Sequence, residues 1–280
     1  SGNSPYKQGQ QPDANAYQPA GVGGVSRLVI DANTYERISS NLVLVGTIRN
    51  CAGGPSPWGW LSCEENTDIN GAYRHGYTFL CPIDAESVQP PQPIIGYGRC
   101  NHEAVAVDPS NHYAYLSEDR GDSCLYRFVP DDPSEPFVGK LQAMRVVGQD
   151  DFQTSNMATG EVVAVEWVDI DEPDPNGDTL RKEAQQKGAA LIVRGEGIWF
   201  FEGQVYLCST SGGPIGKGQI FRLIDGDEPS FELVVAATDA SVLDNPDNIT
   251  VAPWGEVFMV EDGDGEQYIR WIDAEGQVQD

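Results

Sequence analysis

Short runs of hydrophobic residues, separated by turn residues and bounded by polar clusters, recur along most of the chain. Within residues 99–128, apolar runs at 104–107, 113–117 and 125–128 follow one another, and Asp-Pro-Ser-Asn at 108–111 supplies the first turn. Runs of this length between turn residues predict β-strands that pair as an antiparallel meander. Long segments with the 3.6-residue period of an amphipathic helix are nearly absent, so the pattern predicts an all-β fold.

The same arrangement occurs in three further segments, at 51–79, 194–223 and 244–270. Each has one polar cluster before its first strand and a second after its second strand. The two clusters are 13 residues apart in three copies (51 to 64, 196 to 209, 248 to 261) and 15 apart in the fourth (103 to 118). The step of 93 residues from 103 to 196 is about twice the step of 52 between the other copies, so one further unit is expected between residues 130 and 193.

A repeat of this length, built of short strands, is typical of a β-propeller, in which each blade is one meander and the blades surround a central channel. We therefore expect a single β-propeller domain over residues 25–280, with five or six blades and a metal site at the central channel. Strands at 25–30 and 41–47 are expected to help close the ring. Residues 1–24, rich in Gln, Pro, Gly and Asn, predict an extended or disordered arm. Residues 179–187 predict a short, solvated surface helix.

The charge of the chain limits its partners. It has 43 acidic and 17 basic residues among 280, a formal net charge of −26. This balance, without a visible basic patch, argues against a nucleic acid or an anionic membrane as partner. No apolar run approaches the roughly 18 residues of a membrane span, and a monomer is expected. Carboxylates gathered at loop ends suit hard cations such as calcium.

Six cysteines are compatible with disulfides in an oxidising compartment. Fifteen pairings of six cysteines exist, and sequence alone selects none of them. Cys100 and Cys124 bracket one predicted blade and are the favoured pair.

Polar residues that start the first strands of a propeller converge at the channel mouth, because these strands all run beside the axis. In the four copies these residues are Cys51, Glu103, Glu196 and Asn248, with Asp247 beside the last. The second clusters supply Glu64, Glu65, Glu118, Asp119, Glu261 and Asp262. Converging carboxylates repel one another, so such a ring predicts bound cations. Carboxylates and Asn carbonyls suit calcium, and a thiolate adds a ligand for a transition metal.

Each element of this ring also has a simpler interpretation. Glu-Asp-Arg-Gly and Glu-Asp-Gly, taken singly, are ordinary acidic turns, and Cys51 alone fits a buried small hydrophobic residue. The repetition favours the metal site, since independent turns need not be acidic at matching positions. By its position in the first copy, Cys51 is expected to be a metal ligand and not a disulfide partner.

A series of motifs runs in order from about Asn50 to Arg270. They are Asn50-Cys51-Ala52-Gly53-Gly54, Pro57-Trp58-Gly59, Leu61-Ser62-Cys63-Glu64-Glu65-Asn66, Asn101-His102-Glu103-Ala104-Val105, Glu118-Asp119-Arg120-Gly121-Asp122, Arg194-Gly195-Glu196-Gly197-Ile198-Trp199, Ser209-Thr210-Ser211-Gly212-Gly213 and Asp244-Asn245-Pro246-Asp247-Asn248-Ile249. Their combination resembles the PhoX-type alkaline phosphatase family. The resemblance implies a propeller whose axial site holds iron and calcium and hydrolyses small phosphate monoesters in the periplasm or outside the cell. It also implies that the cysteine of the Asn-Cys-Ala motif, Cys51, ligates iron.

Two residues beside the acidic positions are the catalytic candidates. Arg194, two residues before Glu196, is the candidate phosphate clamp, since a guanidinium matches phosphate bidentately. His102 is the second candidate, with the alternative that it satisfies a loop carbonyl. Two rival functions stay open: a calcium-dependent lactonase-like hydrolase, which would need no cysteine ligand, and a non-catalytic binding module stabilised by calcium.

Overall fold

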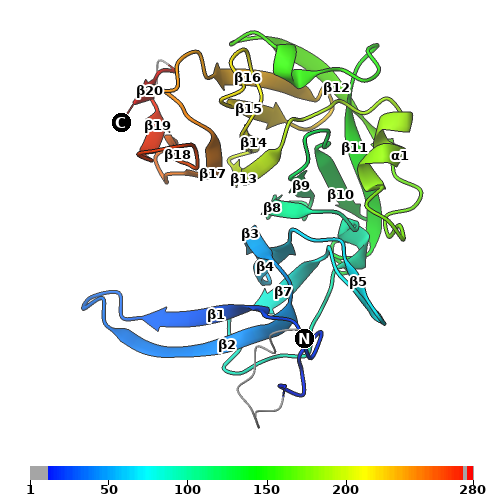
Figure 1. Ribbon diagram of the computed structural model, residues 1–280, viewed down its shortest axis with the longest axis vertical. Helices are drawn as coiled ribbons and strands as arrows, with labels where there is room; N and C mark the ends of the chain where they lie inside the picture. Colours follow the sequence, from blue (N-terminus) through cyan, green and yellow to red (C-terminus); the bar gives the residue numbers. More distant parts are fainter. Residues whose placement is uncertain (1–11, 274–275, 280) are drawn as a thin grey trace.

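The structure, a computed structural model, describes residues 12–273 and 276–279 and consists mainly of antiparallel β-strands (Figure 1). Most of the strands form four meanders that follow one another along the chain. The first contains β3 (Asn50–Ser56), β4 (Gly59–Glu64) and β7 (Thr78–Pro82). The second contains β8 (His102–Val107), β9 (Ala114–Glu118), β10 (Tyr126–Pro130) and β11 (Gly139–Val146).

The other two meanders have four strands each. The third contains β13 (Gly195–Phe201), β14 (Gln204–Ser209), β15 (Gln219–Ile224) and β16 (Ser230–Ala236). The fourth contains β17 (Pro246–Val251), β18 (Val257–Glu261), β19 (Ile269–Ile272) and β20 (Val278–Gln279). The remaining elements are β1 (Gly23–Ile30), β2 (Arg37–Thr47), β5 (Ile69–Asn70), β6 (Tyr73–Arg74), β12 (Val162–Asp169), α1 (Leu180–Gln186) and the 3₁₀ turns Ile95–Tyr97 and Thr154–Asn156.

Three hydrophobic clusters lie between successive meanders and hold them side by side. Val105 and Val107 of β8 belong to the cluster shared with the first meander, whereas Ala104 and Ala106 belong to the cluster shared with the third. Because successive side chains of a strand point to opposite faces, both faces of β8 are buried, and all six of its residues are buried. A third cluster joins the third and fourth meanders. Burial between meanders, and not a single central core, is therefore the main source of hydrophobic stabilisation.

The first strands of the meanders lie next to one another at the centre of the arc. Gly53 of β3 forms a parallel bridge with Ala104 of β8, and β13 contacts both β8 and β17. Glycine permits this approach: a Cβ at Gly54 would lie 1.8 Å from the Val105 carbonyl oxygen, and one at Gly197 would lie 2.7 Å from the Ile249 nitrogen. The sequence thereby brings the starts of four strands to one place.

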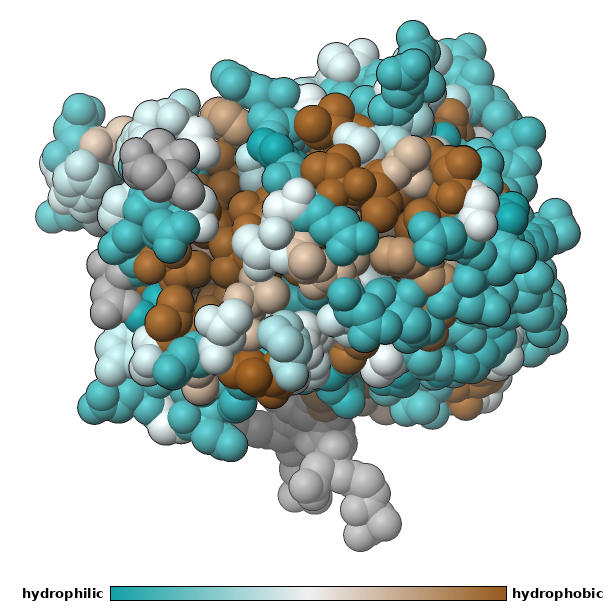
Figure 2. Space-filling view, turned by 90° about the horizontal axis from the view of Figure 1, so that it is seen from above, coloured by the Kyte–Doolittle hydropathy of each residue, from teal (hydrophilic) through white to brown (hydrophobic). Residues whose placement is uncertain are grey.

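The described strands do not close into a ring, and this corrects the expected role of the N-terminal strands. Strands β1 and β2 pair only with each other. In Figure 1 their hairpin and the fourth meander stand on either side of the opening of the arc. A cleft of about 490 Å³ between the first and fourth meanders is lined by apolar side chains that include Trp60, Phe258 and Ile269. Figure 2 shows further hydrophobic patches bordered by hydrophilic residues on the face seen from above.

The unit expected between residues 130 and 193 is not a separate meander. Strand β11 is the outer strand of the second meander, and β12 pairs with β11 on one side and with β16 on the other. The chain then passes through α1 before the third meander begins. The double-length step in the sequence therefore reflects a long connection, and four meanders lie in the described residues where five or six blades were expected.

Three further predictions concern the N-terminal arm, helix α1 and membrane-spanning segments. Residues 1–11 of the predicted arm lie outside the described residues. Tyr17, in the described part of the arm, donates its backbone N–H to the Val45 carbonyl of β2 at 2.9 Å. Helix α1 is not fully solvated, because Leu180, Arg181 and Ala184 are buried. None of the described helices has the length and apolar character of a membrane-spanning helix.

The favoured disulfide is also wrong: all six cysteines are free thiols in the structure. Cys100 precedes β8 and Cys124 precedes β10, and these two strands flank β9 instead of pairing with each other. Both cysteines belong to the hydrophobic cluster between the first two meanders. Both thiols are buried, and burial raises the pKa of each well above its usual value.

Candidate metal centre

One position near the start of the first strand is equivalent in all four meanders. The strand pairings that define it are Asn50 with Glu64, His102 with Glu118, Gly195 with Ser209, and Pro246 with Glu261. The next residues along the first strands are Cys51, Glu103, Glu196 and Asp247. In every meander an irregularity in the pairing, with one extra residue on the first strand, falls at or just after this residue. Such β-bulges re-aim a side chain, and here they turn four side chains toward the centre.

Asp247, and not Asn248, is therefore the equivalent of Glu103 and Glu196. Asn248 is exposed, and its Oδ1 accepts the N–H of Ile249 at 2.8 Å. The spacing of 13 residues from 248 to 261 suggested the wrong partner because the hairpin turn differs in length between meanders, with two residues between Ser56 and Gly59 but five between Val251 and Val257. Counting residues does not preserve pairing across such irregularities.

A second equivalent position follows the second strand of each meander. In each meander the residue at this second position donates its backbone N–H to a backbone carbonyl. The accepting residue lies two positions before Cys51, Glu103, Glu196 or Asp247. The four bonds run from Glu65 to Arg49 (2.9 Å), from Asp119 to Asn101 (3.1 Å), from Thr210 to Arg194 (3.1 Å) and from Asp262 to Asn245 (2.9 Å). The sequence analysis missed Thr210, although the 13-residue spacing from 196 to 209 points to its neighbour. Three of the four accepting residues, Arg49, Arg194 and Asn245, have φ between 49° and 54°, a region that non-glycine residues adopt mainly at special sites.

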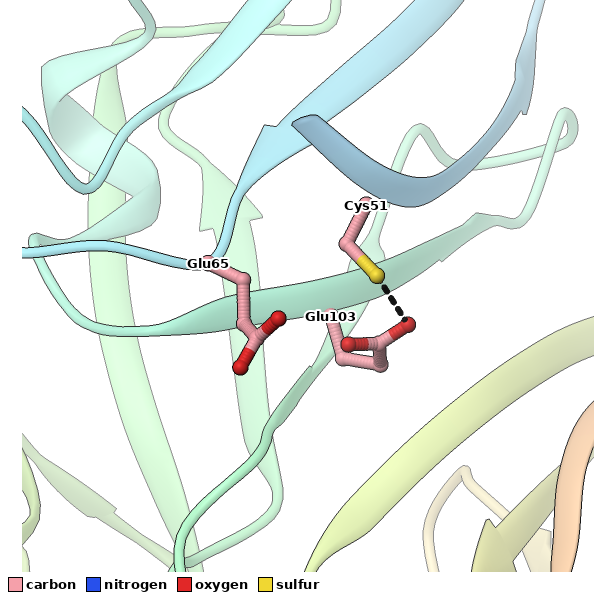
Figure 3. A group of neighbouring side chains, drawn as sticks. All are labelled: Cys51, Glu65 and Glu103. Carbon is pink, nitrogen blue, oxygen red and sulfur yellow. Dashed lines mark hydrogen bonds between the residues drawn. The ribbon is translucent and has the colours of Figure 1, made fainter. Parts of the chain in front are cut away.

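Cys51, Glu65 and Glu103 meet at the centre of the arc (Figure 3). The Cys51 thiol donates to Oε1 of Glu103 at 2.8 Å. One potential ligand atom from each of the three residues lies within 4.8 Å of the others. They come from three separate segments, β3, the end of β4 and β8, so the fold assembles a group that no local sequence motif contains.

Glu196, Asp247 and Asp119 extend this group electrostatically. Burial, together with the charges of Asp247, Glu65 and Asp119, raises the pKa of Glu103 to about 7. Burial and the charges of Glu103, Asp119 and Asp247 raise the pKa of Glu196 to about 10. Burial also raises the pKa of Asp247, and burial and Glu103 raise that of the Cys51 thiol. We call Cys51, Glu65, Glu103, Asp119, Glu196 and Asp247 the axial cluster.

Arg194, like Arg49 beside Glu65, pairs with carboxylates of the axial cluster. Its Nε and Nη2 donate to the two oxygens of Asp119 at 2.8 and 3.0 Å, and Nη2 also donates to Glu196 at 2.7 Å. These carboxylates raise the pKa of the guanidinium. The side chain is 43% exposed, so it lies at the mouth of the cluster and not beneath it.

Three predicted ligands lie elsewhere, because the last residue of a strand and the next residue point to opposite faces. Glu64 accepts the N–H groups of Ile48 and Gly76, at 2.8 and 2.9 Å, and contacts His75. Glu118 accepts the Tyr126 hydroxyl at 2.7 Å. Glu261 lies 2.9 Å from the Arg270 Nε. All three carboxylates are buried and bonded outside the axial cluster.

The last two predicted residues are also separate from the cluster. Asp262 is exposed, and its charge helps to raise the pKa of Asp247. His102 is fully buried, with its Nε2 3.0 Å from the Gly98 carbonyl oxygen, as the simpler interpretation of this residue anticipated. Burial lowers its pKa to about 4.

The donor set of the axial cluster fits metal ions. The thiol of Cys51 and the carboxyl groups of Glu65 and Glu103 offer ligand atoms within 4.8 Å of one another, and the other three carboxyl groups interact with them electrostatically. Two guanidinium groups pair with the cluster, Arg194 with Asp119 and Glu196, and Arg49 with Glu65. Oxygen-rich groups of this kind suit calcium. The thiol of Cys51 adds a softer ligand that calcium does not need and that a transition metal favours. Raised carboxyl pKa values are the expected property of such a site without its cations.

The chain matches a known protein family and is similar in fold to a solved structure. The family model described as "Alkaline phosphatase PhoX" matches residues 29–280. The fold is similar to that of Pseudomonas fluorescens PhoX, solved in complex with vanadate, a transition state analogue, with a TM-score of 0.65 and 19% identity. That similarity covers 94% of this chain and 66% of the solved chain, so this chain spans just under two thirds of its length.

Kuenenia stuttgartiensis hydrazine synthase also matches, with 11% identity over 91% of this chain and 80% of that chain. Its TM-score of 0.40 is too low to indicate a shared fold. No curated protein sequence matches the chain.

Proposed function

The chain belongs to the alkaline phosphatase PhoX family, and from this premise we propose that it hydrolyses phosphate monoesters at cations held by the axial cluster. The observation that carries the proposal is the meeting of Cys51, Glu65 and Glu103, and their electrostatic interaction with Asp119, Glu196 and Asp247, beside a partly exposed arginine. Such a site can neutralise the negative charge of a phosphate ester only if cations outweigh its own carboxylates. Hence the proposal requires metal ions.

We assign iron to the side of the cluster that contains Cys51, and calcium to the carboxylates. Cys51, Glu65 and Glu103 would hold iron, because they include the thiol. Asp119, Glu196 and Asp247 would hold calcium, since they offer only oxygen ligands. When bound, the cations supply Lewis-acid stabilisation of the phosphoryl oxygens.

Arg194 is the phosphate clamp of this proposal. Its guanidinium pairs with both oxygens of Asp119 and with one oxygen of Glu196, so a cation bound to these carboxylates would compete with it. A guanidinium freed from them matches two phosphate oxygens bidentately. Its partly exposed position allows it to reach a substrate at the mouth of the cluster. His102 receives no proton-transfer role, because its ring is buried and bonded to a carbonyl.

The remaining parts of the proposal follow from the family and the arrangement of the strands. We propose that the four meanders are blades of a β-propeller with one axial site, and that the protein acts as a monomer in the periplasm or outside the cell on small phosphate esters. The Cys51 thiol, 2.8 Å from Glu103, favours this function over a lactonase-like hydrolase or a calcium-stabilised binding module, neither of which needs a cysteine ligand.

Hydrolysis of a generic phosphomonoester by the purified protein tests the function. We expect turnover of p-nitrophenyl phosphate in the presence of calcium and iron, and its loss with a chelator. The Cys51→Ser variant should lose iron and its visible charge-transfer absorption while keeping most of its calcium. A protein that binds both metals but hydrolyses no phosphomonoester would contradict the activity. Full retention of iron by Cys51→Ser would contradict the ligand assignment.

A further inference from the structure

Asp178 lies outside the repeated template, at the end of the loop between β12 and α1, yet its carboxylate reaches the second meander. Oδ1 accepts from Nδ2 of Asn101 at 3.2 Å and from Nη1 of Arg181 at 2.7 Å. Oδ2 accepts from Nε of Arg120 at 3.1 Å. One side chain from the long connection therefore joins three segments that are far apart in the sequence.

Two of these partners, Asn101 and Arg120, belong to backbone segments that contain residues of the axial cluster. The carbonyl of Asn101 accepts the N–H of Asp119 at 3.1 Å, and Asn101 is two residues before Glu103. Arg120 directly follows Asp119, and its carbonyl accepts the N–H of Arg194 at 2.9 Å. The Asp178 carboxylate thus lies behind the segments that present two acidic members of the cluster and the arginine at its mouth.

Helix α1 fixes Asp178 in this place. Leu180 and Ala184 pack in the hydrophobic cluster between the first two meanders. Arg181 is buried and donates from Nε to Asp122 at 2.7 Å, and its Nη1 lies 3.3 Å from Glu118. Because the helix is anchored on both its apolar and its polar side, the loop end that precedes it is not free to move away from the second meander.

The hydrogen bonds of Asp178 oppose a repulsion between like charges. Glu103 and Asp119 are both acidic, and repulsion between their ionised carboxylates would push apart the segments that carry them. A carboxylate that holds Asn101 and Arg120 together from behind opposes this separation. Residues that orient ligands from behind in this way commonly change metal affinity 10- to 100-fold when they are replaced.

We propose that Asp178 is a positioning residue of the axial cluster, which holds Asn101 and Arg120 so that Glu103, Asp119 and Arg194 are placed before a cation or substrate binds. The inference rests on the proposed function only for its consequence in catalysis. Its structural content, the preset position of the two acidic segments, can be measured without any turnover.

Calcium titration of the chelated protein tests the proposal with a matched pair of variants. Asp178→Asn removes the charge that faces Arg120 and Arg181, whereas Asp122→Asn weakens only the contacts of Asp122 with Arg181 and Lys182 of α1. We expect Asp178→Asn to weaken calcium binding about 10-fold or more and Asp122→Asn to change it less than about 2-fold. Asp178→Glu should restore part of the affinity. Equal weakening by the two Asn variants, or wild-type affinity in Asp178→Asn, would overturn the proposal.

Amide hydrogen exchange in the chelated protein gives a second readout that needs no metal. The N–H groups of Asp119 and Arg194 should exchange faster in Asp178→Asn than in the wild type or in Asp122→Asn. Unchanged exchange at both amides would overturn the proposal even if the wild-type protein bound no calcium. If exchange and calcium affinity respond as expected but no phosphomonoester is hydrolysed, the proposed function fails and the positioning role stands.

Discussion

Glu64 and Glu65 are neighbours in the sequence, yet they lie in opposite environments. Glu64 is completely buried and accepts two backbone N–H groups as well as contacting His75. Glu65 points to the axial cluster, where Cys51 and Glu103 face it, and its ion-pair partner Arg49 is 62% exposed. The same alternation separates Glu118 from Asp119. What distinguishes a structural carboxylate from a candidate ligand is therefore the supply of hydrogen-bond donors, not the residue type or the local motif.

The charges that surround the carboxylates also differ between the two sides of the strand ends. Carboxylates on the structural side accept hydrogen bonds from fixed groups of the fold, and burial raises the pKa of Glu118 there to about 7. Glu103 receives a hydrogen bond from Cys51 and otherwise faces carboxylates, and its pKa is also raised to about 7. Glu118 has Arg181 and Arg120 beside it, whereas Glu103 has Asp247, Glu65 and Asp119, so a bound cation would favour the ionised form of Glu103.

The largest expected effect is a difference in the free energy of unfolding between variants at Glu64 and at Glu65. Glu64→Ala should lower the free energy of unfolding by about 3–5 kcal/mol, because it leaves the buried N–H groups of Ile48 and Gly76 without an acceptor. Glu65→Ala should lower it by no more than about 1 kcal/mol, since its pair with Arg49 is a surface ion pair. Urea unfolding of both variants in chelator measures the difference. Equal losses would show that the two sides of the strand end do not differ as described.

The second expected effect is a dependence of the chelated protein on pH. A carboxyl pKa raised by folding leaves stability intact below the unfolded value and reduces it as pH rises toward the folded value. For Glu103 this window runs from 4.5 to about 7 and corresponds to a loss of about 3 kcal/mol. Glu196, with a pKa raised to about 10, adds to the loss from 4.5 up to about 10.

Denaturation of the chelated protein between pH 5 and 8 measures this slope. The Glu103→Gln variant, which cannot ionise, should show a smaller fall than the wild type. Calcium should reverse the trend, because binding requires deprotonated carboxylates and strengthens as pH rises. Identical slopes for wild type and Glu103→Gln would mean that Glu103 does not titrate in the cluster.

The smallest expected effect concerns the strand pairing of the fourth meander, which places Asp247 and not Asn248 in the axial cluster. Asp247→Asn should weaken calcium binding about 10-fold, since Asp247 lies in the axial cluster and loses its charge. Asn248→Ala should change the affinity less than about 2-fold, because Asn248 is exposed and bonded to the Ile249 N–H. Calorimetric titration compares the two variants. The opposite order would restore the alignment that the residue spacing suggests.

The sequence predicted the four meanders and the meeting of Cys51 with Glu103, because hydrophobic alternation and turn residues are local signals that the final fold keeps. It did not predict Asp247 at the equivalent position, since hairpin turns of different length change the spacing between the two polar clusters without changing the motif. Nor could it tell Glu118 from Asp119. Which of two adjacent acids faces the axis depends on the pairing at the end of the strand.

Longer-range features were beyond the sequence for a different reason. The 93-residue step between two copies suggested a fifth meander, but β12 pairs with strands of two different meanders and α1 packs on the core. Asp178 carried no signal as a partner of Asn101 and Arg120, because contacts between a connection and a repeat leave no periodic pattern. The Cys100–Cys124 pair failed similarly, since closeness in sequence to one meander does not bring two strands together.

The thermal midpoint of the chelated protein, measured before and after calcium is restored, tests the central claim most directly. The account holds that the axial carboxylates destabilise the fold until cations neutralise them. At a calcium concentration about 100 times the dissociation constant, binding should add about 2.7 kcal/mol, which corresponds to a rise of roughly 5–10 °C. A midpoint that stays unchanged after verified removal and return of calcium would contradict the account and leave the axial cluster as a set of ordinary acidic turns.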